Sequence, residues 1–421
     1  MDTMKDVNIH LENKSESRHF FWFIWIMYAV VYMTKSCYSA ALADIVRDGV
    51  LTKSQTGFIS GAFYVVYAPL QILGGIIADK RSPEKLIIFG LLGGAVANAI
   101  IFFNQNYYVM LGVWLFNAVS QFAIWPSIFK IYSSQLCRSD RPKMVFYMSF
   151  STTAGMLLAY LVAALLPGWE YNFAVSGVAL LFFAVLMYLF SKHLNRFMKK
   201  DYTQEDAPDK AEVVDVKISD LKLFLLSGLF TMLPVIIIRA VVANSVKSLA
   251  PTMLMESYDN ISPSIGNLLN LFIIASGMVG TILVKKIYYP RYIKNELLAY
   301  MPVALLAVPF LFILKNIGNV SILLVIISMC FISALMTAVT LMQSYFNMRY
   351  VRFGKNGTAA GIANCAGAVG IILQNYAVLW LADGLGWSAV STLWIVLVII
   401  LPVFLLIAFL QWKSFSKRKD I

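Results

Sequence analysis

Charged residues are scarce in this sequence: only 13% of its 421 residues are Asp, Glu, Lys or Arg, whereas 60% are hydrophobic. A soluble globular protein has about 25% charged and about 45–50% apolar residues. The scarcity therefore excludes an ordinary soluble domain. Because the apolar runs are continuous instead of alternating, they indicate membrane-spanning helices and not the strands of a barrel.

Metal-binding and nucleophilic residues are scarce as well. Four cysteines are scattered, at Cys37, Cys137, Cys330 and Cys365, with neither the spacing of a metal site nor that of a disulfide framework. The three histidines, His10, His19 and His193, all lie outside the long apolar runs. We therefore expect no metal, no cofactor and no enzymatic activity.

What the chain does contain is a series of apolar runs of about the length needed to cross a bilayer. We count twelve: 20–44, 55–78, 85–104, 107–131, 143–166, 171–192, 222–248, 263–285, 293–315, 319–345, 357–382 and 388–411. One long polar segment, 193–221, divides them six and six. The sequence predicts an all-α membrane protein with twelve transmembrane helices in two six-helix bundles, residues 1–192 and 222–421, joined by a cytoplasmic linker.

The charged residues that remain are mostly basic and are unevenly distributed. The net charge is +12, and the Lys and Arg residues cluster in alternate loops and near the C-terminus. In a membrane protein such an excess marks cytoplasmic loops and does not indicate nucleic-acid binding. We therefore expect a multi-pass protein of the plasma membrane, the inner membrane of a bacterium, with both termini in the cytoplasm.

Two basic residues fall deep inside predicted spans, Lys35 in the first and Arg239 in the seventh. A charge at membrane depth costs about 2.5–3.5 kcal/mol on insertion scales, so it is a functional candidate by default. One interpretation is that the two cations, one from each bundle, form a site for a doubly charged anion. The other is that each snorkels to the interface or pairs within its own bundle. For Lys130 snorkelling and function are equally plausible, and for Lys247 and Lys315, near span ends, we expect snorkelling.

Acidic residues are missing from the interior of the spans; Asp44 lies at the end of the first and Glu296 near the start of the ninth. Proton symporters commonly carry a membrane carboxylate as the proton carrier. Its absence disfavours proton-coupled sugar uptake and favours the exchange of anions.

The short charged turn Gly74–Leu86, GGIIADKRSPEKL, separates the second and third spans. Its spacing resembles the loop between helices 2 and 3 of the major facilitator superfamily, G-x-x-x-D-(R/K)-x-x-x-(R/K)-(R/K). An ordinary positively charged membrane turn is the alternative. The resemblance implies a cytoplasmic latch that gates the transport cycle, made of Gly75, Asp79, Lys80 and Arg81.

Other stretches resemble a narrower family, the organophosphate:phosphate antiporters, which include glycerol-phosphate and hexose-phosphate transporters. The stretches are Thr56–Gly61 with Tyr67, Asp79–Pro83, Gln121 with Trp125-Pro126, and Gly357–Gly361 with Gly386-Trp387. Carried over residue by residue, the first-helix phosphate-binding arginine of that family falls on Lys35 and its fourth-helix basic residue on Lys130.

This chain departs from the family at two further positions. The fifth-helix histidine falls at or near Thr152, so that titratable group is absent. The seventh-helix arginine falls on Ala243, and Arg239 lies one turn earlier on the same face. Neutral side chains on helices that line the cavity in this superfamily complete the predicted substrate site: Tyr32, Gln71, Gln121, Thr152 and Asn364. Interhelical hydrogen bonding is the alternative role for each of these.

The resemblance implies a secondary transporter that exchanges an organophosphate for phosphate by alternating access. Two alternatives stay open: a transporter of a sugar acid or another carboxylate, and a transporter-like membrane sensor of a phosphate ester. The expected partners are a small anionic substrate and the lipid bilayer, with no nucleic acid, and we expect a monomer.

Overall fold

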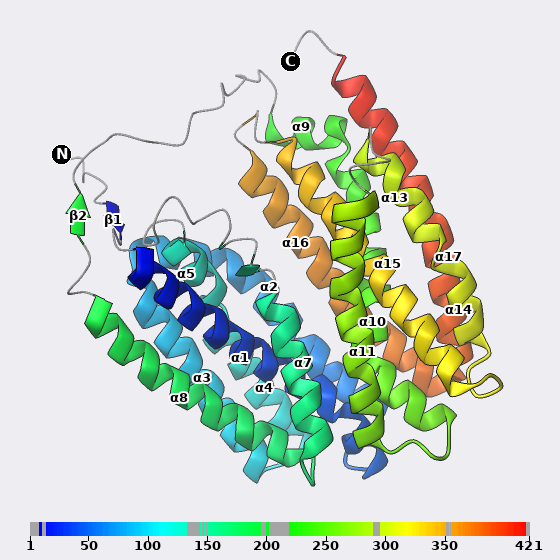
Figure 1. The fold of residues 1–421 in the computed structure, drawn as a ribbon, viewed down its shortest axis with the longest axis horizontal. Coiled ribbons are helices and arrows are strands. Elements are labelled where there is room, and N and C mark those ends of the chain that lie inside the picture. The colour runs from blue at the N-terminus through cyan, green and yellow to red at the C-terminus, as the bar shows by residue number, and fades with distance from the viewer. Residues whose placement is uncertain are drawn as a thin grey trace. The chain divides into compact units, whose positions relative to one another are not determined.

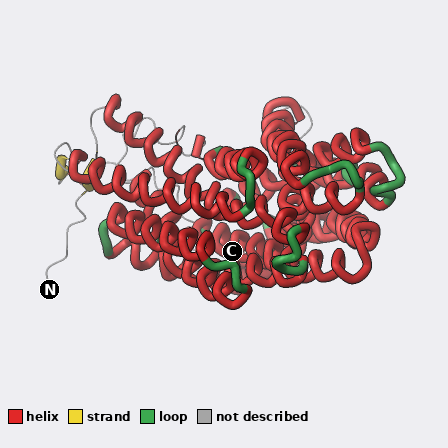
Figure 2. The backbone as a smooth tube through the Cα atoms, turned by 90° about the horizontal axis from the view of Figure 1, so that it is seen from below, coloured by secondary structure: helices red, strands yellow, loops and turns green. Residues whose placement is uncertain are grey.

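The computed structural model describes residues 8–10, 14–132, 144, 147, 148, 150–194, 199–201, 219–288, 295–350, 353 and 355–417. These residues form helices joined by short loops, together with one small antiparallel pair of strands, β1 (Asn8–His10) and β2 (Lys199–Asp201) (Figures 1 and 2). The all-helical architecture confirms the predicted fold class.

Contacts divide the chain into two units, each described here by itself. The first unit comprises residues 1–51 and 62–208, and the second comprises residues 52–61 and 209–421. The start of the second helix thus groups with the second unit, a division that differs from the sequential boundary predicted at the linker. Of that linker, residues 195–198 and 202–218 lie outside the described residues.

The helices of the first unit follow the first six predicted spans. They are α1 (Lys14–Arg47), α2 (Lys53–Lys80), α3 (Pro83–Phe103), α4 (Tyr107–Gln121), α5 (Ile124–Lys130), α7 (Ser151–Leu165) and α8 (Glu170–Leu194). α1 packs against α7 and α8, and α3 packs against α4 and α8. The predicted fourth span is divided into α4 and α5 by a turn at Phe122–Ala123.

The helices of the second unit follow the last six predicted spans. They are α9 (Asp220–Ser227), α10 (Leu229–Ser257), α11 (Pro263–Leu283), η2 (Val284–Tyr288), α13 (Glu296–Leu305), α14 (Val308–Lys315), α15 (Ile322–Met348), α16 (Asn356–Leu373), η4 (Gln374–Val378) and α17 (Leu379–Phe415). α10 is the central element, packing against α11, α15, α16 and α17.

Local sequence explains where several helices begin. α2 starts with a capping box, in which the Thr52 amide donates to Gln55 Oε1 (3.0 Å) and the Gln55 amide donates to Thr52 Oγ1 (3.2 Å). α3 and α11 each start with a serine cap followed by proline, Ser82-Pro83 and Ser262-Pro263. The turn predicted around Gly74–Leu86 is therefore short, because α2 ends at Lys80 and α3 begins at Pro83.

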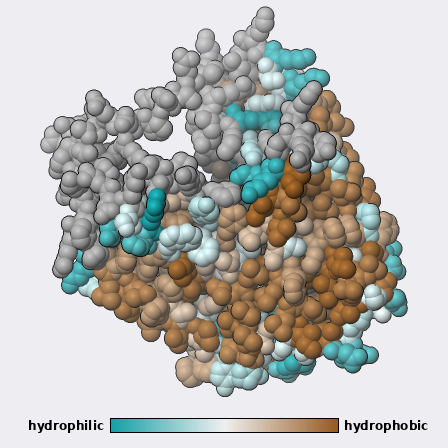
Figure 3. Space-filling model, viewed as in Figure 1, coloured by the Kyte–Doolittle hydropathy of each residue, from teal (hydrophilic) through white to brown (hydrophobic). Residues whose placement is uncertain are grey.

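Within the described residues, nine helical stretches are long and apolar enough to cross a membrane. One of them, Thr358–Phe415, runs through α16, η4 and α17 and so joins the predicted spans 357–382 and 388–411. A kink at Gly386 (φ 77°), inside α17, lies between these two predicted spans. Large apolar side chains lie exposed along these helices, as on α8, where Val178 and Phe182 are among them. Figure 3 shows that hydrophobic residues cover most of the described surface on the face drawn. Such a surface fits a lipid environment.

Candidate functional site

In the first unit, Lys35 lies between two tyrosines. Its Nζ donates a hydrogen bond to the Tyr67 hydroxyl of α2 (2.7 Å). The same nitrogen lies 4.2 Å from the centroid of the Tyr67 ring and 5.6 Å from that of Tyr32. No carboxylate lies within ion-pair distance of Lys35 among the described residues. Aromatic faces attract a cation through their quadrupole, so the cage formed by Tyr32 and Tyr67 stabilises a charge that has no counter-ion among the described residues.

A close helix crossing holds the cage in place. Gly155 of α7 lies so near α1 that a Cβ there would collide with the Ala29 carbonyl and would lie 2.6 Å from Tyr32 Cβ. Thr152 is one turn before Gly155, on the face of α7 that meets α1. Gln71, one turn after Tyr67 on α2, interacts with the Tyr67 hydroxyl. The structure therefore brings Tyr32 to Lys35 and Gln71 to Tyr67, and the predicted role of Thr152 stays a prediction.

The other two predicted substrate residues of the first unit, Gln121 and Lys130, have different partners. Gln121 is fully buried; its Nε2 donates to Asn117 Oδ1 (2.7 Å), and Gly94 of α3 makes room for it. Lys130 donates to the backbone carbonyls of Ala78 (2.6 Å) and Arg81 (3.3 Å), at the end of α2. Ala78 lies about 16 Å along the helix from Tyr67, so Lys130 is not part of the cage around Lys35.

The predicted latch lies at this same end of α2. Gly75, Asp79 and Lys80 belong to α2, but their side chains lie outside what the structure describes. Arg81 is exposed, and its carbonyl accepts the bond from Lys130. The role of these four residues stays a prediction.

In the second unit, α10 carries two cations, Arg239 and Lys247, and both reach threonines of α15. Arg239 Nη1 donates to Thr340 Oγ1 (3.1 Å), and Lys247 Nζ donates to Thr337 Oγ1 (2.5 Å). The Arg239 Nε is buried without a hydrogen-bond partner. Among the described residues neither cation has a carboxylate within ion-pair distance. Both are partly buried.

The position of Lys247 follows from the proline four residues later. Pro251 has no N–H, so the Lys247 carbonyl loses its partner within the helix. Asn270 Nδ2 of α11 donates to that carbonyl instead (2.7 Å). Gly277, two turns further along α11, leaves room for the lysine side chain, because a Cβ there would lie 3.1 Å from Lys247 Cε and 2.9 Å from Thr337 Oγ1. Lys247 is thus held inside the second unit, whereas we had expected it to snorkel.

The remaining predicted residue, Asn364 on α16, is exposed. Its neighbour Ala363 packs with Ile236 of α10, so Asn364 lies about 100° around the helix from that contact. The structure does not bring Asn364 into contact with Arg239 or Lys247. Sequence reasoning assigned Lys247 to snorkelling and did not single out Thr337 and Thr340, although the four-residue spacing from Lys247 to Pro251 was a usable signal.

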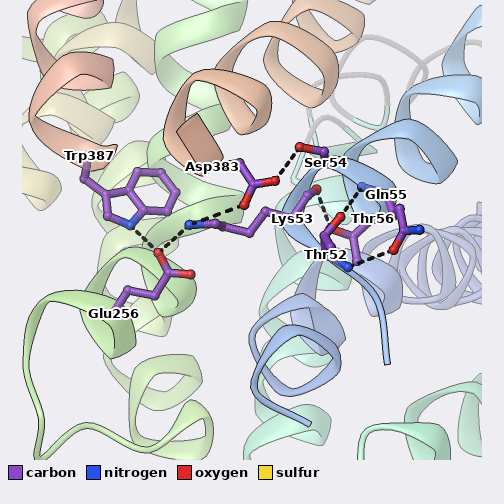
Figure 4. Close-up of polar contacts among 8 residues, drawn as sticks. All are labelled: Thr52, Lys53, Ser54, Gln55, Thr56, Glu256, Asp383 and Trp387. Carbon is purple, nitrogen blue, oxygen red and sulfur yellow. Dashed lines mark hydrogen bonds and ion pairs between the residues drawn. The ribbon is translucent and has the colours of Figure 1, made fainter. Parts of the chain in front are cut away.

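A second polar cluster lies where α2 begins, and Figure 4 shows it. Lys53 Nζ lies 2.9 Å from Glu256 Oε2 of α10 and 4.0 Å from Asp383 Oδ1 of α17. The same Glu256 oxygen accepts the Trp387 indole N–H (2.8 Å), and Asp383 accepts the Ser54 hydroxyl (2.6 Å). This cluster, the α2-start cluster, consists of Lys53, Ser54, Glu256, Asp383 and Trp387.

Close packing accompanies these bonds. A Cβ on Gly57 would collide with the Asn375 carbonyl of η4, and a Cβ on Gly61 would lie 2.6 Å from the Tyr376 ring. Between them Phe58 meets Tyr376 edge to face, with ring centroids 5.3 Å apart. The first two turns of α2 therefore pack directly against η4 and α17.

Comparison with curated proteins gives distant relatives. The chain is 26% identical over 164 residues to the membrane sensor protein UhpC of Salmonella typhimurium, which is 38% of this chain and 37% of that protein. It is 27% identical to the probable sulfoacetate transporter SauU of Cupriavidus necator over 44% of this chain and 41% of that one. A probable hexose phosphate transport protein of Chlamydia trachomatis is 24% identical over 38% of this chain and 35% of its own length. The matches span less than half of these relatives.

Solved structures share the fold over nearly the whole chain. A bacterial homologue of the human lysosomal transporter Spinster, inward-facing and occupied, gives a TM-score of 0.71 at 15% identity over 96% of this chain and 98% of its own. A D-xylose–proton symporter gives 0.68 at 14% identity, over 92% and 97%.

The family model for the Major Facilitator Superfamily matches residues 24–375, most of the chain. This match confirms the resemblance seen around Gly74–Leu86, and it confirms that the protein is not an enzyme, because the superfamily consists of transporters. The chain belongs to the major facilitator superfamily of secondary transporters.

Proposed function

We propose that this transporter moves an anionic metabolite, and that its substrate is an organophosphate exchanged for phosphate. The observation that carries the proposal is the set of cations held at membrane depth by neutral groups only. Lys35 rests on tyrosines and Arg239 on a threonine hydroxyl, with no described carboxylate in ion-pair distance. A bound anion lowers the cost of holding such cations in a low-dielectric site, so their presence supports an anionic substrate.

The mechanism that follows is alternating access with an obligatory ligand. Each unit supplies cationic contacts, Lys35 in the first and Arg239 in the second. An empty site leaves these charges uncompensated, which disfavours the occluded state and couples each crossing to a bound anion. The absence of acidic residues from the interior of the predicted spans supports exchange over proton symport. We place the protein in the bacterial inner membrane with both termini in the cytoplasm, as the basic loops favour.

Two relatives support alternative substrates or roles. The sulfoacetate transporter has a substrate with a carboxylate and a sulfonate, so an organic acid is the second candidate for this chain. The sensor UhpC supports a third candidate, a protein that binds a phosphate ester and signals without transport.

One experiment separates the three. The purified protein is reconstituted in vesicles loaded with phosphate, and the uptake of labelled glucose 6-phosphate, glycerol 3-phosphate, gluconate and sulfoacetate is measured. We expect counterflow of a phosphate ester. Uptake of gluconate or sulfoacetate alone would instead establish the organic-acid transporter, and saturable binding without flux would establish the sensor. The matched control is Lys315→Ala, which removes an exposed lysine at the end of α14.

A further inference from the structure

We propose that Lys247 and Arg239 together form a two-cation subsite in the second unit that selects a doubly charged anionic group, such as a phosphate monoester. The inference rests on the proposed anion transport and assigns the selection of a dianionic group to particular residues of the second unit. The subsite consists of Arg239, Lys247, Thr337 and Thr340, defined here as the α10–α15 subsite.

The two cationic ends converge although their backbones are far apart. Arg239 and Lys247 are eight residues apart on α10, about 12 Å along the helix axis. Their partners Thr337 and Thr340 are three residues apart on α15, and side chains at that spacing have Cβ atoms about 5–6 Å apart. The arginine therefore reaches toward the C-terminal end of α10 and the lysine reaches back, so that both charges lie within about one helical turn of α15.

Two cations brought this close repel each other unless an anion lies near. In an apolar surrounding that repulsion is much stronger than in water. Among the described residues, the two cations donate to the hydroxyl groups of Thr340 and Thr337, and the Nε of Arg239 has no hydrogen-bond partner. A group with two negative charges compensates both cations, whereas a single charge compensates one. A threonine hydroxyl can accept a hydrogen bond from a cation and also donate one to an anionic oxygen. Thr337 and Thr340 can therefore hold the cations in the empty site and bind the anion when it is present.

The second unit is built to hold Lys247 in this place, which argues against an incidental lysine. Pro251 frees its carbonyl, Asn270 captures that carbonyl, and Gly277 clears the path of the side chain. A lysine that merely reached for the interface would need none of these features.

The test measures ligand-induced thermal stabilisation of the purified protein at pH 8 with glucose 6-phosphate, a dianion there, and gluconate, a monoanion of similar size. For Lys247→Met we expect the apparent affinity for glucose 6-phosphate to fall about tenfold or more, and that for gluconate to fall less than threefold. Lys315→Met is the control and should leave both unchanged.

Thr337→Val separates charge from packing. It removes the hydroxyl that holds Lys247 but keeps the ammonium group, so we expect it to retain most of the preference for the dianion. If Thr337→Val lost as much of that preference as Lys247→Met, the lysine would be a packing element. An equal loss for both ligands in Lys247→Met would also overturn the subsite. If Lys247→Met does not fold, Lys247→Gln gives the same comparison.

The outcome for the subsite is distinct from that for transport. If vesicles show no exchange while glucose 6-phosphate stabilises the wild type in a manner that depends on Lys247, the proposed exchange fails and the subsite stands. If the wild type exchanges a phosphate ester but Lys247→Met keeps its dianion preference, the exchange stands and the subsite fails. A wild type stabilised by neither ligand would overturn the subsite.

Discussion

The two units hold their buried cations in different ways. In the first unit Lys35 lies over the Tyr67 ring and donates to its hydroxyl. In the second, Arg239 and Lys247 donate to aliphatic hydroxyls of α15, and among the described residues no aromatic ring lies over either cation. An aromatic face stabilises a cation without competing for an anion's oxygens, whereas a threonine is a weak partner that an anion readily joins or replaces. We infer that Lys35 in the first unit stays charged whether or not an anion is bound, and that Arg239 and Lys247 in the second unit distinguish one anion from another.

The strongest test of this comparison removes one cation from each unit. We expect Lys35→Ala and Arg239→Ala each to abolish transport, because truncating one partner of a buried charge pair with the substrate costs about 2–5 kcal/mol, more than thirtyfold in affinity. Counterflow in reconstituted vesicles measures the effect, with Lys315→Ala beside them. Near-normal flux in Arg239→Ala would mean that its charge is structural.

A smaller but still large effect should follow from filling the space at Gly277. In Gly277→Val the new side chain meets Thr337 Oγ1, Ser333 Oγ and Lys247 Cε, all within 3.1 Å of the Cβ position. Overpacking of this kind costs about 1–3 kcal/mol. We expect a lower unfolding temperature and a loss of dianion binding at the α10–α15 subsite.

The control for Gly277 is Gly361→Ala, since a Cβ at that α16 position meets nothing within 4 Å. If Gly277→Val bound glucose 6-phosphate as the wild type does, the room made by this glycine would be irrelevant to the position of Lys247.

The difference between the units was only partly visible in the sequence. The spans and the family were predictable because hydrophobic runs and turn motifs are local. Lys35 and Arg239 were found because a charge in an apolar run stands out. The partners that distinguish these two cations were not found: Tyr67 is 32 residues from Lys35 and Thr340 is 101 residues from Arg239, so each pair depends on how helices pack.

Lys130 and Lys247 also show that the sequence does not predict which partner a lysine near a span end will have. Lys130 matched a family position but donates to two backbone carbonyls at the end of α2. Lys247 matched no family position and was assigned to snorkelling. A lysine near a span end has the same sequence signature in either role, because only the neighbouring helix decides what its nitrogen meets.

Removing one hydroxyl beside a buried cation in each unit should have a moderate effect and tests the difference between the units. Tyr67→Phe removes the hydroxyl bonded to Lys35 but keeps the ring beneath it, and Thr340→Val removes the hydroxyl bonded to Arg239. A neutral donor or acceptor contributes about 0.5–1.5 kcal/mol net. We expect transport to fall about threefold in Tyr67→Phe and up to about tenfold in Thr340→Val. The apparent affinity for glucose 6-phosphate checks both, and a larger loss in Tyr67→Phe would reverse the assignment of roles.

The smallest effect should come from the α2-start cluster, which lies apart from the buried cations and contains true ion pairs. Glu256→Gln removes the charge opposite Lys53 while its amide oxygen still accepts the Trp387 N–H. Since both partners are less than a quarter exposed, we expect the free energy of unfolding to fall by about 0.5–1 kcal/mol, the upper range for pairs near a surface.

Asp383→Asn, at the longer 4.0 Å contact, should lower the free energy of unfolding by less. Thermal unfolding in detergent at low and high salt measures both: the difference between wild type and Glu256→Gln should shrink as salt screens the pair. A difference independent of salt would show that Glu256 stabilises the fold through its hydrogen bond to Trp387 and not through its charge. In that case, of the charges tested in the second unit, those of the α10–α15 subsite alone would affect a measured property.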